Sequence, residues 1–287
     1  MDRFAVNEGV TTTQLAYLSL LKASQPTPLA QGILRPSLCL VLQGRKRVLI
    51  ERQVIHYGAE SYIVASVDMP LAGQIIEASK AKPYLGIKFD LDPAEMASLA
   101  LETKIAWDTQ SKAGRAVHIG QVDLNLRDAL VRLVRLLETS RDLLALAPFI
   151  KREILYRLLT SEAAPLIWQT AVAEGEDFGI ARSVAWLKEN FIRPIAIEEL
   201  AKEARLSVSR FYRRFKTVTT LAPLQYQKRL RLLEARRVLL AGTADAATAG
   251  FKVGYESPSQ FSREYRRLFG APPKQDLGKL RNLPLAF

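Results

Sequence analysis

The chain has 287 residues and a formal net charge of +12, with 41 lysines and arginines against 29 aspartates and glutamates. This length is enough for two domains, each with its own core. The lone cysteine, Cys39, excludes a disulfide framework within the chain and is expected to be a small buried thiol. The chain has no apolar run of about 18 residues and no signal-peptide core, so we expect a cytoplasmic protein without a membrane partner.

The positive charge is unevenly distributed along the chain. Residues 176–287 contain 21 lysines and arginines against 11 acidic residues, a net charge of +10, whereas residues 1–175 contain 20 against 18, a net charge of +2. A basic region of this kind favours a partner with a phosphate backbone. A solvated basic surface is the alternative.

Short apolar or alternating runs between residues 34 and 90 predict β-strands. The predicted strands cover residues 37–43, 47–51, 61–66, 73–77 and 84–89, with a turn over residues 44–46. Their spacing, with glycine and proline between them, favours a small antiparallel β-barrel of the cupin-like type. The predicted fold class of the whole chain is α+β.

The interior of this barrel is a candidate effector pocket. A barrel of this size has room for its own side chains or for one small ligand. Both readings stay open, and a ligand would be small and mostly apolar. The candidate lining residues are the inward apolar positions Leu40, Leu42, Val48, Ile50, Ile63, Val64, Ile75 and Ile87.

After residue 92 the apolar spacing becomes helical, and helices are predicted at 93–102, 123–139 and 144–159. They would complete a regulatory domain over residues 1–175, with its helices within 93–172. One of the two longer helices is a candidate for association into a homodimer. Packing within the monomer is the alternative.

From residue 176 onward the pattern is helical almost throughout, so we expect a second domain over residues 176–287, with the boundary at the polar segment 174–177. Predicted helices cover residues 180–189, 197–204, 223–240 and 245–251. The segment 207–216 (SVSRFYRRFK) returns fifty positions later as 257–266 (SPSQFSREYR). The chain therefore carries two copies of one small unit.

Each copy has the layout of a helix-turn-helix, over residues 197–217 and 245–267. Phe211 and Phe215 are four residues apart and fall on one helical face, whereas Arg213 falls on the opposite face. Ser207 is the expected N-cap of the first recognition helix. The helix over residues 223–240 is about 26 Å long, so it would set the two recognition helices about one DNA turn, roughly 34 Å, apart.

The C-terminal hundred residues resemble the DNA-binding domain of AraC/XylS-type bacterial transcriptional regulators. Both copies, the helix between them and the segment 250–273 (GFKVGYESPSQFSREYRRLFGAPP) occur in the family's order. Residues 37–47, 66–70 (SVDMP) and 152–159 (REILYRLL) resemble, less specifically, the barrel-like regulatory domain of one branch of that family. The resemblance implies double-stranded DNA, a small-molecule effector, a second copy of the chain and RNA polymerase as partners, with no cofactor.

The resemblance also implies roles for individual residues. The positions expected to face the groove are Ser209, Tyr212, Arg213, Ser259, Gln260 and Arg263, with Arg210 as a candidate for phosphate. Arginine can bind both guanine acceptors and glutamine can bind adenine. The first copy departs from the family at Arg205, where glycine is frequent, as at Gly254 in the second copy. If that position has a positive φ, arginine costs about 1 kcal/mol there.

Two other classes of function are weighed against this one. A cupin-like enzyme fused to a DNA-binding module would need a metal site, but the chain has only two histidines, His56 and His118, in no ligand spacing. We expect no catalytic and no metal-binding residues. A constitutive DNA-binding protein without an effector would not need the near-neutral N-terminal half. The favoured reading is an effector-controlled, sequence-specific regulator.

Overall fold

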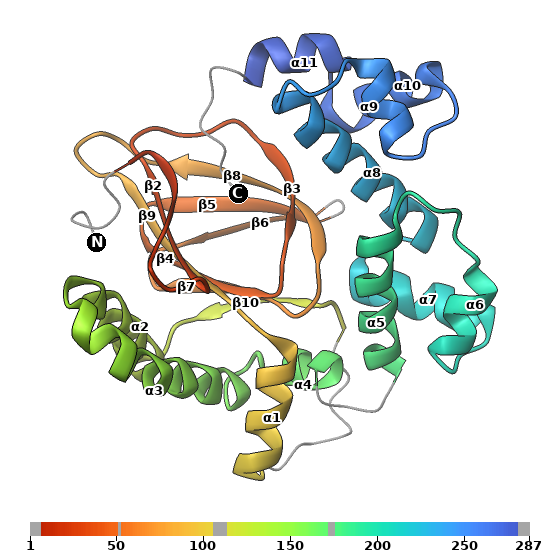
Figure 1. Ribbon diagram of the computed structural model, residues 1–287. Helices are drawn as coiled ribbons and strands as arrows, with labels where there is room; N and C mark the ends of the chain where they lie inside the picture. Colours follow the sequence, from red (N-terminus) through yellow and green to blue (C-terminus); the bar gives the residue numbers. More distant parts are fainter. Residues whose placement is uncertain (1–6, 51–52, 106–113, 172–175, 281–287) are drawn as a thin grey trace.

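The computed structural model describes residues 7–50, 53–105, 114–171 and 176–280. Strands dominate the N-terminal half and helices the C-terminal half, which confirms the predicted α+β class (Figure 1). Within these residues, no helix has the length and apolar character needed to cross a membrane. The predicted boundary residue Glu174 and the predicted strand end Glu51 lie outside the described residues.

Two antiparallel sheets form the N-terminal domain. The larger sheet has the order β1-β2-β9-β4-β7-β10 and the smaller has the order β3-β8-β5-β6. The strands are β1 (Gly9–Thr12), β2 (Leu18–Ala23), β3 (Ala30–Leu34), β4 (Ser37–Gln43), β5 (Arg45–Ile50), β6 (Gln53–Gly58), β7 (Ser61–Ala65), β8 (Met69–Glu77), β9 (Tyr84–Asp90) and β10 (Val117–Gln121).

The sheets extend beyond the predicted barrel range of 34–90. Strands β1, β2 and β3 come before residue 34, β10 comes after the first helix, and β6 lies in a stretch that was predicted as a connection. Of the turn predicted over residues 44–46, Gly44 lies at the turn, with φ at 84°, whereas Arg45 and Lys46 already belong to β5. This turn takes the chain from the larger sheet to the smaller one, since β4 and β5 do not pair. A Cβ at Gly44 would lie 2.5 Å from the Glu77 carbonyl oxygen, so this corner needs glycine.

Four helices of the N-terminal half, one before β10 and three after it, share the hydrophobic core of the strands (Figure 1). They are α1 (Pro93–Thr103), α2 (Leu124–Arg135), α3 (Ser140–Leu159) and α4 (Ala164–Ala171), with a short 3-10 turn η1 (Leu136–Glu138) after α2. Asp92 and Asp123 cap α1 and α2, because their carboxylates accept hydrogen bonds from first-turn amides. The three predicted helices are confirmed, and α3 begins four residues before its predicted start.

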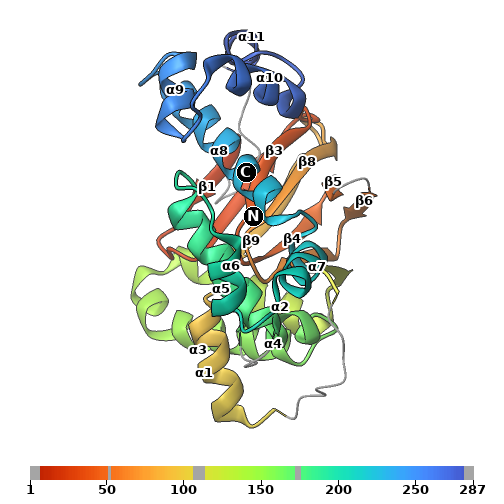
Figure 2. The same cartoon turned by 90° about the vertical axis from the view of Figure 1, so that its right-hand side faces the viewer.

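The C-terminal half contains two groups of helices joined by one long helix. They are α5 (Glu176–Asn190), α6 (Ile197–Glu203), α7 (Val208–Thr219), α8 (Pro223–Leu240), α9 (Ala246–Lys252), α10 (Pro258–Phe269) and α11 (Pro273–Leu280). Figures 1 and 2 show α8 running from the α5–α7 group to the α9–α11 group. The predicted bounds of α8 are confirmed, whereas α11 was not predicted.

The buried residues form two clusters that do not follow the predicted domain boundary. One cluster extends from Leu18 in β2 to Leu230 in α8 and includes the core of the first helix-turn-helix. The other contains Leu232, Ala235 and Leu239 of α8 together with the buried residues of α9 and α10. The first helix-turn-helix therefore shares its core with the sheets, and the second has its own.

Candidate nucleic-acid interface and effector cavity

The first helix-turn-helix consists of α6 and α7 with a tight turn between them. The Ser207 hydroxyl accepts a hydrogen bond from the Arg210 amide at 3.4 Å, which confirms Ser207 as the N-cap of α7. Arg205 in the turn has φ at 57°. A positive φ at Arg205 was the condition under which we expected backbone strain. The turn therefore holds a non-glycine residue at a position that favours glycine.

The second helix-turn-helix consists of α9 and α10 and has the same plan. Asp245 caps α9 through the Thr248 amide at 2.8 Å, and Ser257 caps α10 through the Gln260 amide at 3.4 Å. The turn residue is Gly254, with φ at 87°. A Cβ at Gly250 would lie 3.0 Å from the Phe261 ring, so α9 approaches α10 closely because this residue is small.

Each recognition helix has one buried aromatic face. Phe211 and Phe215 of α7 are fully buried, with ring centroids 5.6 Å apart. Phe261 and Tyr265 of α10 are likewise buried, with centroids 5.5 Å apart. These four residues fix each recognition helix on its supporting helices, as the four-residue spacing predicted.

Four of the predicted reading residues lie on the faces of α7 and α10 opposite these aromatic rings, namely Ser209, Arg213, Ser259 and Arg263, whereas Tyr212 packs partly against the core. Arg213 and Arg263 occupy equivalent positions in the two copies, and both are exposed. Tyr212 and Gln260 are half-buried. The remaining predicted positions are exposed as well: Ser209, Arg210 and Ser259. The structure thus brings together one set of candidate reading residues on each helix.

Two acidic residues, neither of them predicted as part of the site, form contacts with this surface. Glu176 at the start of α5 forms an ion pair with Arg210, the candidate phosphate contact. Glu264 of α10 accepts hydrogen bonds from Lys228 at 2.9 Å, Tyr255 at 2.9 Å and Gln260 at 3.4 Å. Burial opposes ionisation of Glu264, but these hydrogen bonds outweigh it and lower its pKa. Glu264 therefore helps to set the orientation of the Gln260 side chain.

The neighbouring arginines Arg213 and Arg214 differ in their surroundings. Arg214 is largely buried and forms a bidentate ion pair with the buried carboxylate of Asp177 in α5. Hydrogen bonding to Asp177 raises the pKa of Arg214. Arg213 is one helical step further round and points away from this pair. One arginine thus anchors α7 on α5 and the next is available at the surface.

A cavity of about 360 Å³ lies between the two sheets of the N-terminal domain. Of the predicted lining residues, Val48, Ile63 and Ile87 line it. Leu40, Ile50, Val64 and Ile75 are buried outside its lining, and Leu42 lines a different pocket. Cys39 takes the place expected for Leu40, because successive residues of β4 face opposite sides of the sheet. The full lining is Val10, Ser19, Leu21, Ile33, Leu34, Arg35, Cys39, Lys46, Val48, Tyr57, Ile63, Leu71, Tyr84, Gly86, Ile87 and Lys88.

Two polar groups inside the cavity have shifted pKa values. Burial lowers the pKa of the Lys46 ammonium, and the nearby Cys39 partly offsets this effect. Burial raises the pKa of the Cys39 thiol, and the residue as a whole is half-buried, where a buried thiol was predicted, because it lines the cavity. Two tyrosines of the lining, Tyr57 and Tyr84, also have raised pKa values because they are buried.

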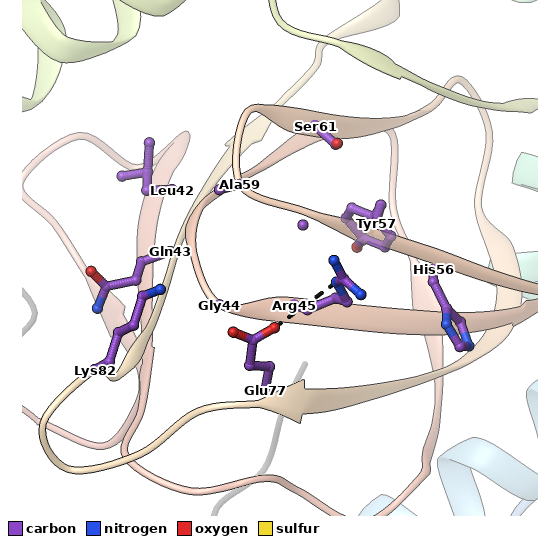
Figure 3. Close-up of a pocket in the computed structure, with 11 residues that line it drawn as sticks. Leu42, Gln43, Gly44, Arg45, His56, Tyr57, Ala59, Ser61, Glu77 and Lys82 are labelled. Carbon is purple, nitrogen blue, oxygen red and sulfur yellow. Dashed lines mark ion pairs between the residues drawn. The ribbon is translucent and has the colours of Figure 1, made fainter.

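A second, more open pocket lies at the rim of the same domain, where β4 turns into β5 (Figure 3). Arg45 and Glu77 form a long ion pair of 3.9 Å across it. Tyr57 lines both this pocket and the interior cavity, so its ring lies between the two. His56 is on the rim, whereas His118 is on β10 opposite Val64. The described residues contain no group of three or more His, Cys, Asp or Glu side chains that could hold a metal ion.

Comparison with known families matches both halves of the chain. Residues 14–166 match the family described as AraC-type transcriptional regulator N-terminus, and residues 200–278 match a helix-turn-helix domain. The chain belongs to the AraC-type transcriptional regulators. The predicted resemblance is thereby confirmed for both halves of the regulator.

Curated proteins similar to this regulator include bacterial transcriptional activators. It is 30% identical over 146 residues to the HTH-type transcriptional activator RhaS of Salmonella schwarzengrund, which is 50% of this chain and 51% of the relative. A RhaS protein of Salmonella arizonae is 29% identical over the same length. The chain thus spans about half the length of the curated relatives it matches.

Solved structures of ToxT from Vibrio cholerae share the fold over nearly the whole chain. One of them, bound to (E)-4-(8-methylnaphthalen-1-yl)but-3-enoic acid, has a TM-score of 0.59 at 11% identity and covers 94% of this chain and 99% of ToxT. An unsaturated fatty acid-bound ToxT has a TM-score of 0.54 at 10% identity, over 93% of this chain and 97% of ToxT. At this identity the likeness concerns the fold alone.

The two halves of the regulator meet at the loop before β8. The Asp68 carboxylate accepts from the Lys188 ammonium of α5 at 2.9 and 3.0 Å, and the Asp68 carbonyl accepts from the Tyr226 hydroxyl of α8 at 2.8 Å. Asp68 and Tyr226 are both buried. Arg229 of α8 donates to Gln31 of β3 at 2.7 Å. These contacts tie α5 and α8 to strands that also line the cavity.

A main-chain hydrogen bond adds to this junction. The Ala116 amide, just before β10, donates to the Val218 carbonyl in the last turn of α7 at 3.0 Å. The end of the first recognition helix is therefore held by the N-terminal domain. For the second recognition helix, the hydrogen bonds given above come from within the C-terminal half.

Proposed function

We propose that this AraC-type regulator binds specific DNA through α7 and α10 and that a small molecule in its interior cavity controls this binding. The observation that carries the proposal is the duplicated helix-turn-helix, with a buried aromatic face and an exposed basic face in each copy. A recognition helix of this kind enters the major groove. The basic excess of residues 176–287 supports binding to the phosphate backbone.

The proposed division of labour between the exposed residues follows their chemistry. Arg213 and Arg263 would read guanine and Gln260 would read adenine. The other groove-facing positions, Ser209, Tyr212 and Ser259, can reach a base edge or a phosphate. Arg210 would bind phosphate once it leaves Glu176, so this ion pair weakens DNA binding in the free protein. The 18 residues of α8 extend about 27 Å, which favours two successive major grooves on one face of DNA.

Effector control is supported by the cavity and by its position. Its volume of about 360 Å³ suits a small ligand. Ile33 and Leu34 of β3 and Leu71 of β8 line it, and the neighbouring residues Gln31 and Asp68 contact the DNA-binding half. A ligand that displaces these strands would change how α5 and α8 are held. It shifts the equilibrium only if it binds one arrangement more tightly than the other. The ligand-bound ToxT relatives support this part of the proposal.

We further propose that the regulator is a homodimer and that α3 carries the contact. Phe149 of α3 is 71% exposed and lies on the same helical face as the exposed Tyr156, seven residues later, whereas Leu144, 84% exposed, lies on a different face of α3. Leu101 of α1 extends the face of Phe149 and Tyr156 sideways, since the adjacent Glu102 pairs with Arg152 of α3 at 2.9 Å. Exposed apolar side chains of this size mark interaction surfaces.

The proposed domains are residues 1–175 and 176–287, as predicted from the change in charge. A chromosomal target implies the cytoplasm of a bacterium. The relatives named as activators favour RNA polymerase as a further partner at the promoter. We assign no catalytic function to the chain.

Salt-dependent DNA binding by the full chain tests the proposal. The probe is the DNA just upstream of the protein's own gene and its neighbours, and the control is a scrambled duplex of equal length. We expect selective binding with a steep dependence on salt. Equal, weak binding to every genomic and scrambled duplex would contradict a specific reader.

A further inference from the structure

The recognition helix of the second copy carries one acidic side chain, Glu264, next to a candidate reading residue. Its carboxylate accepts hydrogen bonds from Lys228 of α8 at 2.9 Å, from Tyr255 in the turn at 2.9 Å and from Gln260 at 3.4 Å. Tyr255 is buried, and the Glu264 side chain is only 20% exposed. The donors come from three different parts of the chain, so they fix the carboxylate beside Gln260.

The Glu264 carboxylate is an anion that only accepts hydrogen bonds. Burial raises the pKa of this carboxyl, but the hydrogen bonds from Lys228, Tyr255 and Gln260 outweigh burial and leave the pKa below its ordinary value. Burial and the bond to Glu264 raise the pKa of Tyr255, so its hydroxyl remains the donor. An ionised carboxylate has no hydrogen to donate. Glu264 therefore binds the amide nitrogen of Gln260 and repels the amide oxygen.

This contact decides which groups of Gln260 remain for DNA. The amide has two N–H donors and one acceptor oxygen. With one N–H bound to Glu264, the other N–H and the oxygen form a donor–acceptor pair, which matches the N7 acceptor and N6 donor of adenine in the major groove. Guanine presents two acceptors at that edge, N7 and O6. The fixed amide would set its oxygen against one of them, whereas a freely rotating amide could turn both N–H groups toward guanine.

The first copy has a different arrangement at the same positions. Arg210 and Arg214 stand where the second copy has Gln260 and Glu264, fifty residues later. Both arginines form ion pairs with acidic residues at the start of α5. The first recognition helix thus has two cations where the second has an amide and an anion. An anion on a recognition helix opposes binding to the phosphate backbone of every DNA sequence alike.

We propose that Glu264 sets the base specificity of the second copy, because it holds Gln260 in the orientation that pairs with adenine and rejects guanine, at a cost in affinity for DNA in general. Glu264 is a positioning residue, and Gln260 is the residue that touches the base. This inference rests on the proposed function of α10 as a recognition helix and adds how its choice of base is enforced.

Selection of binding sites from a pool of random DNA duplexes by the full chain tests this proposal. The wild type defines the specific site, and Gln260→Ala identifies the base pair at which Gln260 acts. We expect adenine at this base pair, preferred over guanine by at least about 10-fold. Replacing this adenine by 7-deazaadenine removes the N7 acceptor and should weaken binding of the wild type by about the same factor.

Glu264→Gln is the decisive variant, and Glu256→Gln is its matched control. Glutamine keeps the shape of Glu264, but its amide offers donors as well as an acceptor, so it accepts Gln260 in either orientation. We expect Glu264→Gln to reduce the preference for adenine over guanine to less than about 3-fold, at that base pair alone. Its affinity for a scrambled duplex should rise about 2- to 3-fold, because a negative charge is removed.

The control separates the charge from the orientation. Glu256 lies in the turn of the same copy and is exposed. Glu256→Gln removes the same charge, so it should also raise the affinity for the scrambled duplex, but it should keep the full preference for adenine. A loss of that preference in Glu256→Gln as large as in Glu264→Gln would mean that charge alone, and not the contact with Gln260, determines the base.

The outcomes also distinguish this inference from the proposed function. An unchanged preference for adenine in Glu264→Gln, or a loss of selectivity at every base pair of the site, would show that Glu264 does not position Gln260. A wild type that prefers guanine at the Gln260-dependent base pair would overturn the proposal without any variant of Glu264. If the wild type selects no sequence from the pool, the proposed DNA reader itself fails.

Discussion

The two helix-turn-helix copies have nearly the same local plan but different surroundings. The buried residues of the first copy join the cluster that begins in β2, whereas those of the second form a separate cluster with the end of α8. The first recognition helix ends in a main-chain hydrogen bond to the N-terminal domain. The repeated sequence thus determines the helix-turn-helix motif itself. The contacts around each copy determine whether that copy moves with the regulatory domain.

The two copies also differ in the residues that occupy their left-handed backbone positions. At the turn and at the end of the recognition helix, the second copy has Gly254 and Gly270, with φ at 87° and 81°. The first copy has Arg205 and Thr220 at these positions, with φ at 57° and 68°. Left-handed conformations are unfavourable for these residues. The first copy therefore accepts local strain, and packing on the N-terminal domain holds it in place.

The largest expected difference concerns the aromatic cores. Phe211→Ala and Phe261→Ala should each cost about 3–5 kcal/mol of local stability, because both rings are fully buried. Hydrogen exchange should then increase in the first copy and in the adjoining strands for Phe211→Ala, but only in α8–α11 for Phe261→Ala. If Phe261→Ala increases exchange in the sheets as strongly, the cores are not separate.

The next effect concerns the ion pair at the junction. Lys188→Met should cost about 2 kcal/mol, because it leaves the buried Asp68 carboxylate without its bidentate cation. This expected loss of stability is small for a buried carboxylate because Lys188 is partly exposed. We expect a lower melting temperature and faster hydrogen exchange in α5. Lys228→Met, which removes an ion pair of the second copy, is the control and should leave α5 unchanged.

DNA-binding measurements should show that the two copies read different halves of the specific DNA site. Arg213→Ala and Arg263→Ala should each weaken binding to the specific site by about 1–3 kcal/mol, each at its own half of the site. Arg210→Ala should weaken binding to all sequences alike and reduce the salt dependence. Titrations against the site and against duplexes mutated in one half measure these effects. An equal loss on specific and random DNA for Arg213→Ala or Arg263→Ala would argue against base reading.

The smallest effects concern the backbone. Arg205→Gly and Thr220→Gly should each stabilise the first copy by about 0.5–1 kcal/mol, since glycine accepts a positive φ. Gly254→Ala should destabilise the second copy, because its Cβ would lie 2.7 Å from the Ile192 carbonyl oxygen. Chemical denaturation measures all three variants. Destabilisation by both glycine substitutions would mean that these positions carry no strain.

The sequence predicted the C-terminal half better than the sheets. Helix caps and aromatic spacing are local signals, so Ser207, Asp245 and the bounds of α8 could be read from neighbouring residues. Strand pairing is not local. Strands β1 and β3 are short and partly exposed, and β10 pairs with β7 about fifty residues away in sequence. The periodicity of apolar residues in the sequence does not indicate which distant strands pair.

The cavity shows the same limit at the level of single residues. Val48, Ile63 and Ile87 were predicted to line it and do so, whereas Leu40 and its neighbour Cys39 exchange places. Apolar character does not reveal which side of a strand faces the interior when both sides are buried. The facing of Lys46 and Cys39 depends on the packing of two sheets, so neither residue could be assigned to the cavity from its sequence.

The boundary between the two cores has a practical consequence for chimeric regulators. It falls within α8, between Leu230 and Leu232, and not at the predicted linker near residue 175. A fusion made at residue 175 would separate Lys188 and Tyr226 from Asp68, the residue of the N-terminal half that both of them contact. A fusion within α8 would exchange one recognition unit and leave each core whole. New DNA specificity is therefore best introduced by replacing the second unit alone.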